Sequence, residues 1–325
     1  MQNEMFENKI DLTVVANSIT KIKDEVRKVI VGQETMVELL LASILADGHV
    51  LIEGVPGVAK TLTSKVLAKT ISADFSRIQF TPDLMPSDVT GVSVFNQKTS
   101  EFDFKKGPIF SNIVLIDEIN RAPAKTQAAL FEVMEERQIT VDGNTYLMDP
   151  PFMILATQNP IDQEGTYKLP EAQLDRFLFK IVVRYPQAEE EFLILKDAHL
   201  NGSRADLSKI GAVLSKQEIK EIREAVQKVH VEDHLIRYIT SIIQETRNNA
   251  SLYLGASPRA SVAILRASKA IAAIRGRDFV TPEDIQEVTS PVLEHRVVVT
   301  AEKEMEGITV SDVLKQIIKK IEVPR

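Results

Sequence analysis

A lysine and the hydroxyl residue after it, Lys60 and Thr61, stand where a chain can bind a polyphosphate. Strand-forming residues at 50–52 are followed by a glycine-bearing loop and then by a helix-compatible segment. In that order, loop N–H groups turn toward a phosphate, and the helix start adds roughly half a positive charge. Lys60 would reach the β- and γ-phosphates, and Thr61 would ligate Mg²⁺. The predicted nucleotide-binding residues of this segment are Gly54, Val55, Pro56, Gly57, Val58, Ala59, Lys60, Thr61 and Leu62.

Ala59 departs from the general phosphate-loop pattern, which has a glycine at this position before Lys60. Alanine adopts right-handed helical dihedral angles readily, but it is strained at positive φ. We therefore expect Ala59 to lie in the first turn of the helix. The alternative for the whole segment is an ordinary strand, turn and helix with an exposed lysine.

Two carboxylates, Asp117 and Glu118, follow the apolar residues 113–116. Four consecutive apolar residues suit a strand buried on both faces of a parallel sheet, and ligands bind at the carboxyl ends of such strands. Asp117 would hold the Mg²⁺ coordination shell, and Glu118 would accept a proton from the attacking water. The alternative is a strand that ends in a solvated acidic turn.

Asn159 follows another apolar segment, 152–157, and is placed to orient a water near the γ-phosphate. It would otherwise only begin a turn before a proline. Arg176 precedes a fifth predicted strand at 178–183. It pairs or caps within its own subunit, or it reaches a neighbour's γ-phosphate across an interface.

Arg259 opens a helix directly after Ser257 and Pro258, a hydroxyl cap with proline at the first helical position. From the residues alone an ordinary surface arginine is the better interpretation, and the prediction that Arg259 points back at the nucleotide depends on the family resemblance given below. Val31 and Gly32 form a turn before the first strand. That turn is placed to flank an adenine ring, or it is a plain corner between two helices.

The chain divides into an α/β domain over residues 1–186 and a helical domain over residues 187–325. Two hairpins are predicted within the first domain, at 92–104 and at 139–147, and the second has an Asp-Gly turn signal. Beyond the boundary the apolar spacing is almost wholly helical.

Composition excludes several classes of protein. A chain of 325 residues is too long for one small core. The net charge of −7 argues against a broad nucleic-acid surface, which needs clustered Lys and Arg. No cysteine is present, so disulfides and thiolate chemistry are excluded, and no apolar run is long enough to span a membrane. We expect that the acidic N-terminal segment is not a signal peptide and that the protein is cytoplasmic.

Taken in order, these motifs closely resemble those of the MoxR family of AAA+ ATPases. The segments that carry the resemblance are GVPGVAKT (54–61), IVLIDEINRAPAKTQAALFEVMEER (113–137), ATQNP (156–160), LPEAQLDRF (169–177) and GASPRA (255–260). Ala59 matches the GxPGxAKT form of that family. The resemblance makes Lys60 and Thr61 the Walker A pair and Asp117 and Glu118 the Walker B pair. It assigns the sensor 1, arginine-finger and sensor 2 roles, respectively, to Asn159, Arg176 and Arg259.

The resemblance also implies the fold and the activity. We expect a P-loop AAA+ domain with a five-stranded parallel sheet in the order 5-1-4-3-2, helices on both faces, and an all-α lid. The 92–104 hairpin would be an insert in the second helix of that domain, and the 139–147 hairpin would precede sensor 1. The expected activity is Mg²⁺-dependent hydrolysis of ATP in a homo-oligomeric ring, expected as a hexamer. Whether Arg259 acts on its own subunit's nucleotide or on a neighbour's is open.

The biological role implied by the resemblance is chaperone-like remodelling or maturation of client proteins, often beside a von Willebrand factor A domain protein. Two other roles remain open, an ATPase subunit of a metal chelatase and a nucleic-acid-dependent motor. A nucleotide-gated scaffold without catalysis is disfavoured by the carboxylate of Glu118.

Overall fold

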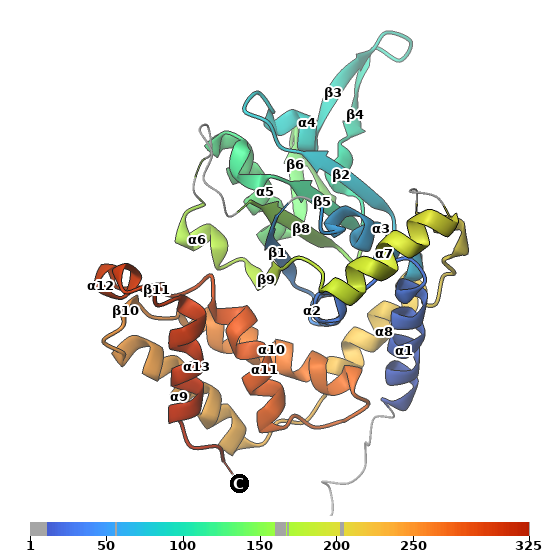
Figure 1. Ribbon diagram of the computed structural model, residues 1–325. Coiled ribbons are helices and arrows are strands. Elements are labelled where there is room, and N and C mark those ends of the chain that lie inside the picture. Colours follow the sequence, from blue (N-terminus) through green and yellow to red (C-terminus); the bar gives the residue numbers. More distant parts are fainter. Residues whose placement is uncertain (1–11, 56, 160–166, 168, 202–204, 325) are drawn as a thin grey trace, which may run out of the picture.

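The computed structural model describes residues 12–55, 57–159, 167, 169–201 and 205–324. Its centre is a five-stranded parallel sheet (Figure 1) in the order β2-β5-β8-β1-β9. The strands are β1 (His49–Gly54), β2 (Phe75–Gln79), β5 (Ile113–Asp117), β8 (Met153–Gln158) and β9 (Phe177–Val183). In terms of the five predicted strands this order is 5-1-4-3-2, so the predicted topology is confirmed.

Helices cover both faces of this sheet because its strands are apolar on both sides. In β1, Val50 and Ile52 face one hydrophobic core, whereas Leu51 faces the other. The helices of this part of the chain are α1 (Thr13–Arg27), α2 (Glu34–Leu45), α3 (Lys60–Thr70), α4 (Pro86–Thr90), α5 (Ala124–Glu136) and α6 (Glu171–Leu174). Short 3-10 turns lie at Pro108–Phe110, Ile119–Arg121 and Leu207–Lys209.

Both predicted hairpins are present. The first consists of β3 (Gly91–Asn96) and β4 (Glu101–Lys106) and projects away from the sheet (Figure 1). The second consists of β6 (Gln138–Val141) and β7 (Asn144–Leu147), and its Asp142-Gly143 turn has positive φ at both residues. The rings of Phe104 and Tyr146 lie 4.5 Å apart between centroids, so the two hairpins contact each other.

The remainder of the chain is mostly helical, as predicted. Its helices are α7 (Ala188–Asn201), α8 (Lys216–Gln227), α9 (Asp233–Asn248), α10 (Pro258–Ile274), α11 (Pro282–Leu293), α12 (Ala301–Met305) and α13 (Val310–Lys320). A two-stranded antiparallel ribbon, β10 (Leu252–Leu254) with β11 (Val298–Val299), was not predicted. Strands of two or three residues are too short to show an alternating pattern. None of the described helices is both long and apolar enough to cross a bilayer.

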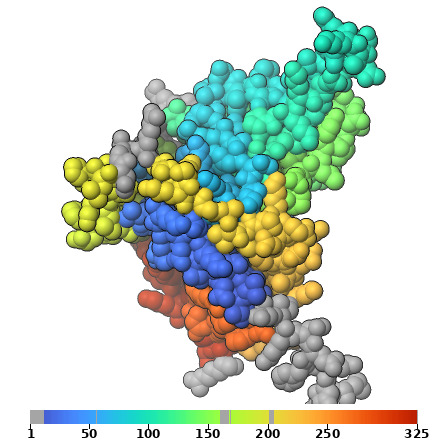
Figure 2. All heavy atoms as spheres, turned by 90° about the vertical axis from the view of Figure 1, so that its right-hand side faces the viewer, coloured from blue at the N-terminus to red at the C-terminus, as the bar shows by residue number. Residues whose placement is uncertain are grey.

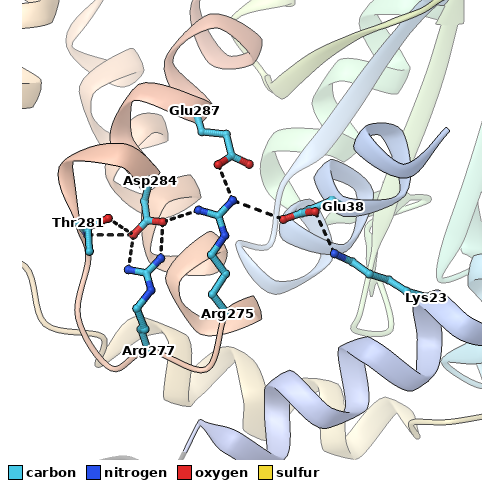
Figure 3. Close-up of polar contacts among 7 residues, drawn as sticks. All are labelled: Lys23, Glu38, Arg275, Arg277, Thr281, Asp284 and Glu287. Carbon is cyan, nitrogen blue, oxygen red and sulfur yellow. Dashed lines mark hydrogen bonds and ion pairs between the residues drawn. The ribbon is translucent and has the colours of Figure 1, made fainter. Parts of the chain in front are cut away.

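A polar network joins the lid helices to α1 and α2 (Figure 3). Asp284 is fully buried in α11, and its carboxylate contacts Arg275 at 3.0 Å and Arg277 at 2.6 Å. Arg275 also lies 3.8 Å from Glu38 of α2, which pairs at 2.9 Å with Lys23 of α1. The network therefore ties the lid to the N-terminal helices of the α/β domain.

A second junction lies at the carboxyl end of α2. Asp47 pairs with Arg137 at 3.0 Å and with Arg223 of α8 at 2.8 Å, and its backbone carbonyl accepts a 3.0 Å bond from Arg266 of α10. Cations are favourable at this end of a helix, where backbone carbonyls lack partners. The two lid helices are thus fixed to the edge of the sheet from which β1 begins.

Candidate active site

The loop between β1 and α3 holds Lys60 beside two carboxylates. The ammonium group of Lys60 donates a 2.7 Å hydrogen bond to the carbonyl oxygen of Gly54. Burial lowers the pKa of Lys60, and the negative charges of Asp117 and Glu118 act in the opposite direction. The lysine therefore lies at the carboxyl ends of β1 and β5, together with the two acids.

The apolar side chains of the loop face the protein rather than the site. Val58 is buried, and Val55 and Leu62 pack against the same core. Gly57 is exposed at a φ of +86°, with nothing within 4 Å of the position of a Cβ. The backbone N–H groups of the loop are therefore available to bind a ligand. Pro56 lies outside the described residues.

Ala59 does not adopt the conformation that we predicted. It is the N-cap of α3, with φ +59° and ψ +18°, in the left-handed region rather than in the first helical turn. Its carbonyl oxygen accepts the first helical bond, from the Thr63 amide at 2.9 Å, and packing of Ala59 on the core holds the turn. The strain of a left-handed alanine, roughly 1–2 kcal/mol, therefore lies at the end of the phosphate loop, directly before α3.

Asp117 and Glu118 are joined through a threonine of the neighbouring strand. The hydroxyl of Thr157 in β8 donates to Asp117 Oδ1 at 3.1 Å and accepts the backbone N–H of Glu118 at 3.0 Å. Asp117 Oδ2 pairs with Arg77 Nε at 2.6 Å. Sequence patterns did not single out Thr157 or Arg77. Thr157 lies near the end of β8 and Arg77 in the middle of β2, the two strands that flank β5.

Glu118 has a left-handed backbone, with φ +58° and ψ +52°. Its Oε2 atom accepts a 2.9 Å bond from the Gln79 amide and lies 3.1 Å from Arg121 Nε. Two side chains from β2 and from the turn after β5 therefore fix the direction of the carboxylate. Neither was predicted. The Gln79 contact depends on the order of strands in the sheet, whereas the Arg121 contact is local, between residues three apart.

Asn159 directly follows β8, the strand that lies between β1 and β5. It is half-buried. Because parallel strands end at one edge, the structure brings Asn159 to the same edge as Lys60, Thr61 and the two acids.

The turn at Val31-Gly32 reaches this edge through the segment that follows β9. A Cβ on Gly32 would lie 2.5 Å from Glu190 Oε1, and Gln33 donates to the Arg184 carbonyl at 3.4 Å. Beside them is an open depression of about 480 Å³ that includes Gly54 and Val55 of the loop. Arg184 lines this depression and links it to the turn through Gln33, but neither Val31 nor Gly32 is among the lining residues.

Arg176 lies at the opposite edge of the sheet. The residue after it, Phe177, is in register with His49, at the start of β1, whereas Gly54 at its end pairs with Val183. Five residues of strand separate the two ends of β1, which is about 16 Å. The structure therefore does not bring Arg176 to Lys60 of its own chain.

Arg259 lies with Arg176 and not with Lys60. Glu135 of α5 pairs with Arg176, and its other oxygen lies 3.9 Å from Arg259 Nη2. Both arginines line a cavity of about 420 Å³ at the amino edge of the sheet. Three further arginines line the same cavity, namely Arg137, Arg266 and Arg296.

The donor set at the carboxyl edge suits a metal held mainly by substrate. Among the described residues, no three His, Asp or Glu side chains form a metal cluster. Asp117 and the Thr61 hydroxyl would leave most positions to phosphate oxygens and water. Mg²⁺ binds in this manner in phosphate-transferring sites, whereas a dedicated all-protein cage would need more ligands.

Comparisons with known proteins agree with this geometry. Residues 49–179 match the ATPase family associated with various cellular activities (AAA), and residues 244–317 match the AAA lid domain. Chaperone MoxR1 of Mycobacterium tuberculosis is 43% identical over 93% of this chain and 81% of its own length. The uncharacterized protein YeaC of Bacillus subtilis is 47% identical over 94% of both chains.

A solved structure is similar over nearly the whole length. The crystal structure of a candidate ATPase from Cytophaga hutchinsonii superimposes with a TM-score of 0.89 at 43% identity, covering 97% of each chain. The fold, the lid and the sequence relatives agree, and the chain belongs to the MoxR family of AAA+ ATPases.

Proposed function

We propose that this protein hydrolyses ATP to ADP and phosphate at the carboxyl edge of its sheet. The loop N–H groups and Lys60 bind the β- and γ-phosphates, and Thr61 and Asp117 hold Mg²⁺. Glu118 takes a proton from water as the water oxygen attacks the γ-phosphorus, and the bond between that phosphorus and the β–γ bridging oxygen breaks. The supporting observation is the position of Lys60 beside Asp117 and Glu118.

Magnesium, when bound, neutralises charge on the phosphate oxygens. The protein's own residues position the two acids and the attacking water. Thr157 fixes Asp117 relative to the backbone of Glu118, and Gln79 and Arg121 hold the Glu118 carboxylate. Asn159 orients the attacking water from the end of β8. In this assignment Val31 and Gly32 flank the adenine.

A second copy of the chain completes the site. Arg176 and Arg259 share Glu135 at the amino edge of the sheet, about 16 Å away from the phosphate loop of their own chain. We assign both to the γ-phosphate of a neighbouring subunit, in a ring that we propose to be a hexamer. An arginine finger contributes a factor of about 10³–10⁵ in rate, so an isolated subunit would be nearly inactive.

The decisive experiment is the Glu118→Gln variant. Glutamine keeps the size of the side chain but removes the proton acceptor, so ATP and Mg²⁺ should bind with unchanged affinity while turnover falls by at least about 10²-fold. Calorimetry and a phosphate-release assay measure the two quantities. Turnover at the unsubstituted rate would refute the role of Glu118. The Glu302→Gln variant, at an exposed position of α12, is the matched control.

The biological role proposed is chaperone-like remodelling or maturation of client proteins in the cytoplasm, with a von Willebrand factor A domain protein as a partner. The name of the relative Chaperone MoxR1 supports the first part. Glu118→Gln protein loaded with ATP should retain clients that the unsubstituted protein releases. Affinity capture with and without ATP, followed by mass spectrometry, tests this proposal. Identical capture in both conditions would contradict it.

A further inference from the structure

The middle of helix α7 has four consecutive large apolar residues, 192–195, that all lie in solvent. Five large apolar side chains of α7 are between 41% and 68% exposed, namely Phe192, Leu193, Ile194, Leu195 and Leu200. None of the described α7 side chains, 188–200, belongs to either hydrophobic core. Figure 2 shows this yellow part of the chain on the surface beside the blue N-terminal helices.

Large apolar side chains grouped in this way are normally buried. Contiguous exposed apolar surface marks an interaction site. The patch extends before the helix, since Val182 is 44% exposed and Tyr185 is 68% exposed. A partner that covers α7 would therefore remove a substantial apolar area from water.

The position of α7 indicates which surface is the partner. The helix follows the carboxyl end of β9, and Glu190 lies against Gly32, so α7 begins at the edge that holds the phosphate loop. Arg176, which follows α6, lies at the other edge. Figure 1 shows α6 and α7 on opposite sides of the sheet. A neighbour that supplies Arg176 to the phosphate loop would also reach α7.

Charge favours the same partner. The first turn of α7 contains three consecutive acids, 189–191. The cavity beside Arg176 and Arg259 has five arginines against three acids, and its lining includes Met134 and Val262, the latter 55% exposed. An acidic turn followed by an apolar helix thus matches a basic cavity with apolar lining.

We propose that α7 is a subunit interface that packs against the rim of the arginine-lined cavity of a second copy of this chain. Such a contact joins two different surfaces, and contacts of this kind close into rings. The inference rests on the proposed function for the placement of Arg176, and it adds the surface that brings the arginine into place.

The first test changes α7 in the full chain. The double variant Phe192→Glu/Leu195→Glu puts charge on the patch, and Tyr253→Glu/Met305→Glu is the matched control on lid residues that are 80% and 84% exposed. Sedimentation with a non-hydrolysable ATP analogue should show that the α7 variant needs at least about tenfold more protein to assemble. The control should assemble like the unsubstituted chain.

Assembly of the α7 variant at the unsubstituted concentration would overturn the proposal. An unsubstituted chain that stays monomeric would also overturn it. A large fall in the melting temperature of the monomeric α7 variant would overturn it too, because it would show that α7 packs against its own chain. Nucleotide binding by the unsubstituted chain is measured separately. Its absence would refute the proposed function, while the sedimentation result would still decide the interface.

The second test uses the absence of cysteine from the chain. Glu189→Cys and Val262→Cys proteins are mixed with the ATP analogue and treated with a short bismaleimide. The expected product is a crosslink between the two different variants, in larger amount than from either variant alone. Equal crosslinking in the mixture and in the single variants would contradict this pairing of surfaces.

Discussion

His49, at the start of β1, is a buried histidine whose two ring nitrogens both have backbone partners. Nδ1 accepts the N–H of Ile154 at 3.0 Å, and Nε2 lies 3.1 Å from the Met134 carbonyl. An amide can only donate and a carbonyl can only accept, so the ring must be neutral, with its proton on Nε2. Burial, helped by the charge of Arg137, lowers the pKa of His49 to about 3.

This arrangement predicts a loss of stability in mild acid. In the unfolded chain His49 is protonated near pH 6.5, whereas in the folded chain it stays neutral down to about pH 3. The free energy of unfolding therefore falls as pH falls through this window. The contribution of His49 is about 2 kcal/mol between pH 7 and pH 5. Urea unfolding at the two pH values measures it.

The His49→Asn variant is the comparison. Asparagine can accept the Ile154 amide but does not titrate, so the variant should be less stable at pH 7 and should lose about 2 kcal/mol less on acidification. His295, whose pKa burial also lowers, contributes equally to both proteins. Equal losses in the two proteins would contradict the role of His49.

At the scale of elements, the lid is attached to the α/β domain by side chains rather than by the chain connection alone. Asp284 is the fully buried carboxylate of the network in Figure 3. It accepts from Arg275, from Arg277 and from the backbone N–H of Thr281, where it also closes the N-terminal cap of α11. The Asp284 carboxylate therefore pairs with two guanidinium groups and also caps the N-terminus of α11.

We predict that Asp284→Asn destabilises the protein by about 3 kcal/mol, because two partly buried guanidinium groups lose their counter-charge. Denaturant unfolding measures this change. The matched control is Glu287→Gln, which removes another partner of Arg275 at a side chain that is 40% exposed and should cost less than about 1 kcal/mol. Equal costs for the two variants would show that the buried carboxylate has no special role.

At the scale of the whole molecule, the residues that we assign to the active site lie at two edges of one sheet. Lys60 and Glu118 lie at the carboxyl edge, whereas Arg176 and Arg259 lie with Glu135 at the amino edge. In the proposed function, one chain therefore contributes two incomplete halves, and a head-to-tail neighbour would join them.

A mixing experiment tests this division. Arg176→Ala should bind ATP but hydrolyse it at least about 10³-fold more slowly, and Lys60→Ala should lose nucleotide binding. Mixed rings should recover part of the activity, because a Lys60→Ala subunit still supplies Arg176 to a neighbour's ATP. A mixture no more active than its two components would show that the arginine acts within its own chain.

The sequence by itself determined which candidate site residues meet at the carboxyl edge of the sheet. The apolar runs that end at Gly54, Asp117 and Asn159 have the composition of buried parallel strands, and such strands end at one edge whatever their order. The two hairpins and the main lid helices were also predictable, because turn signals, caps and apolar spacing are local properties of the chain.

Only the tertiary structure decided the contacts between distant segments. The order of the strands places Thr157 and Gln79 around the two acids, and it separates Arg176 from Lys60. The packing of the loop on the core holds Ala59 in a left-handed conformation that its own preference disfavours. Local sequence sets what each segment prefers, but contacts between segments depend on how the whole chain fills its core.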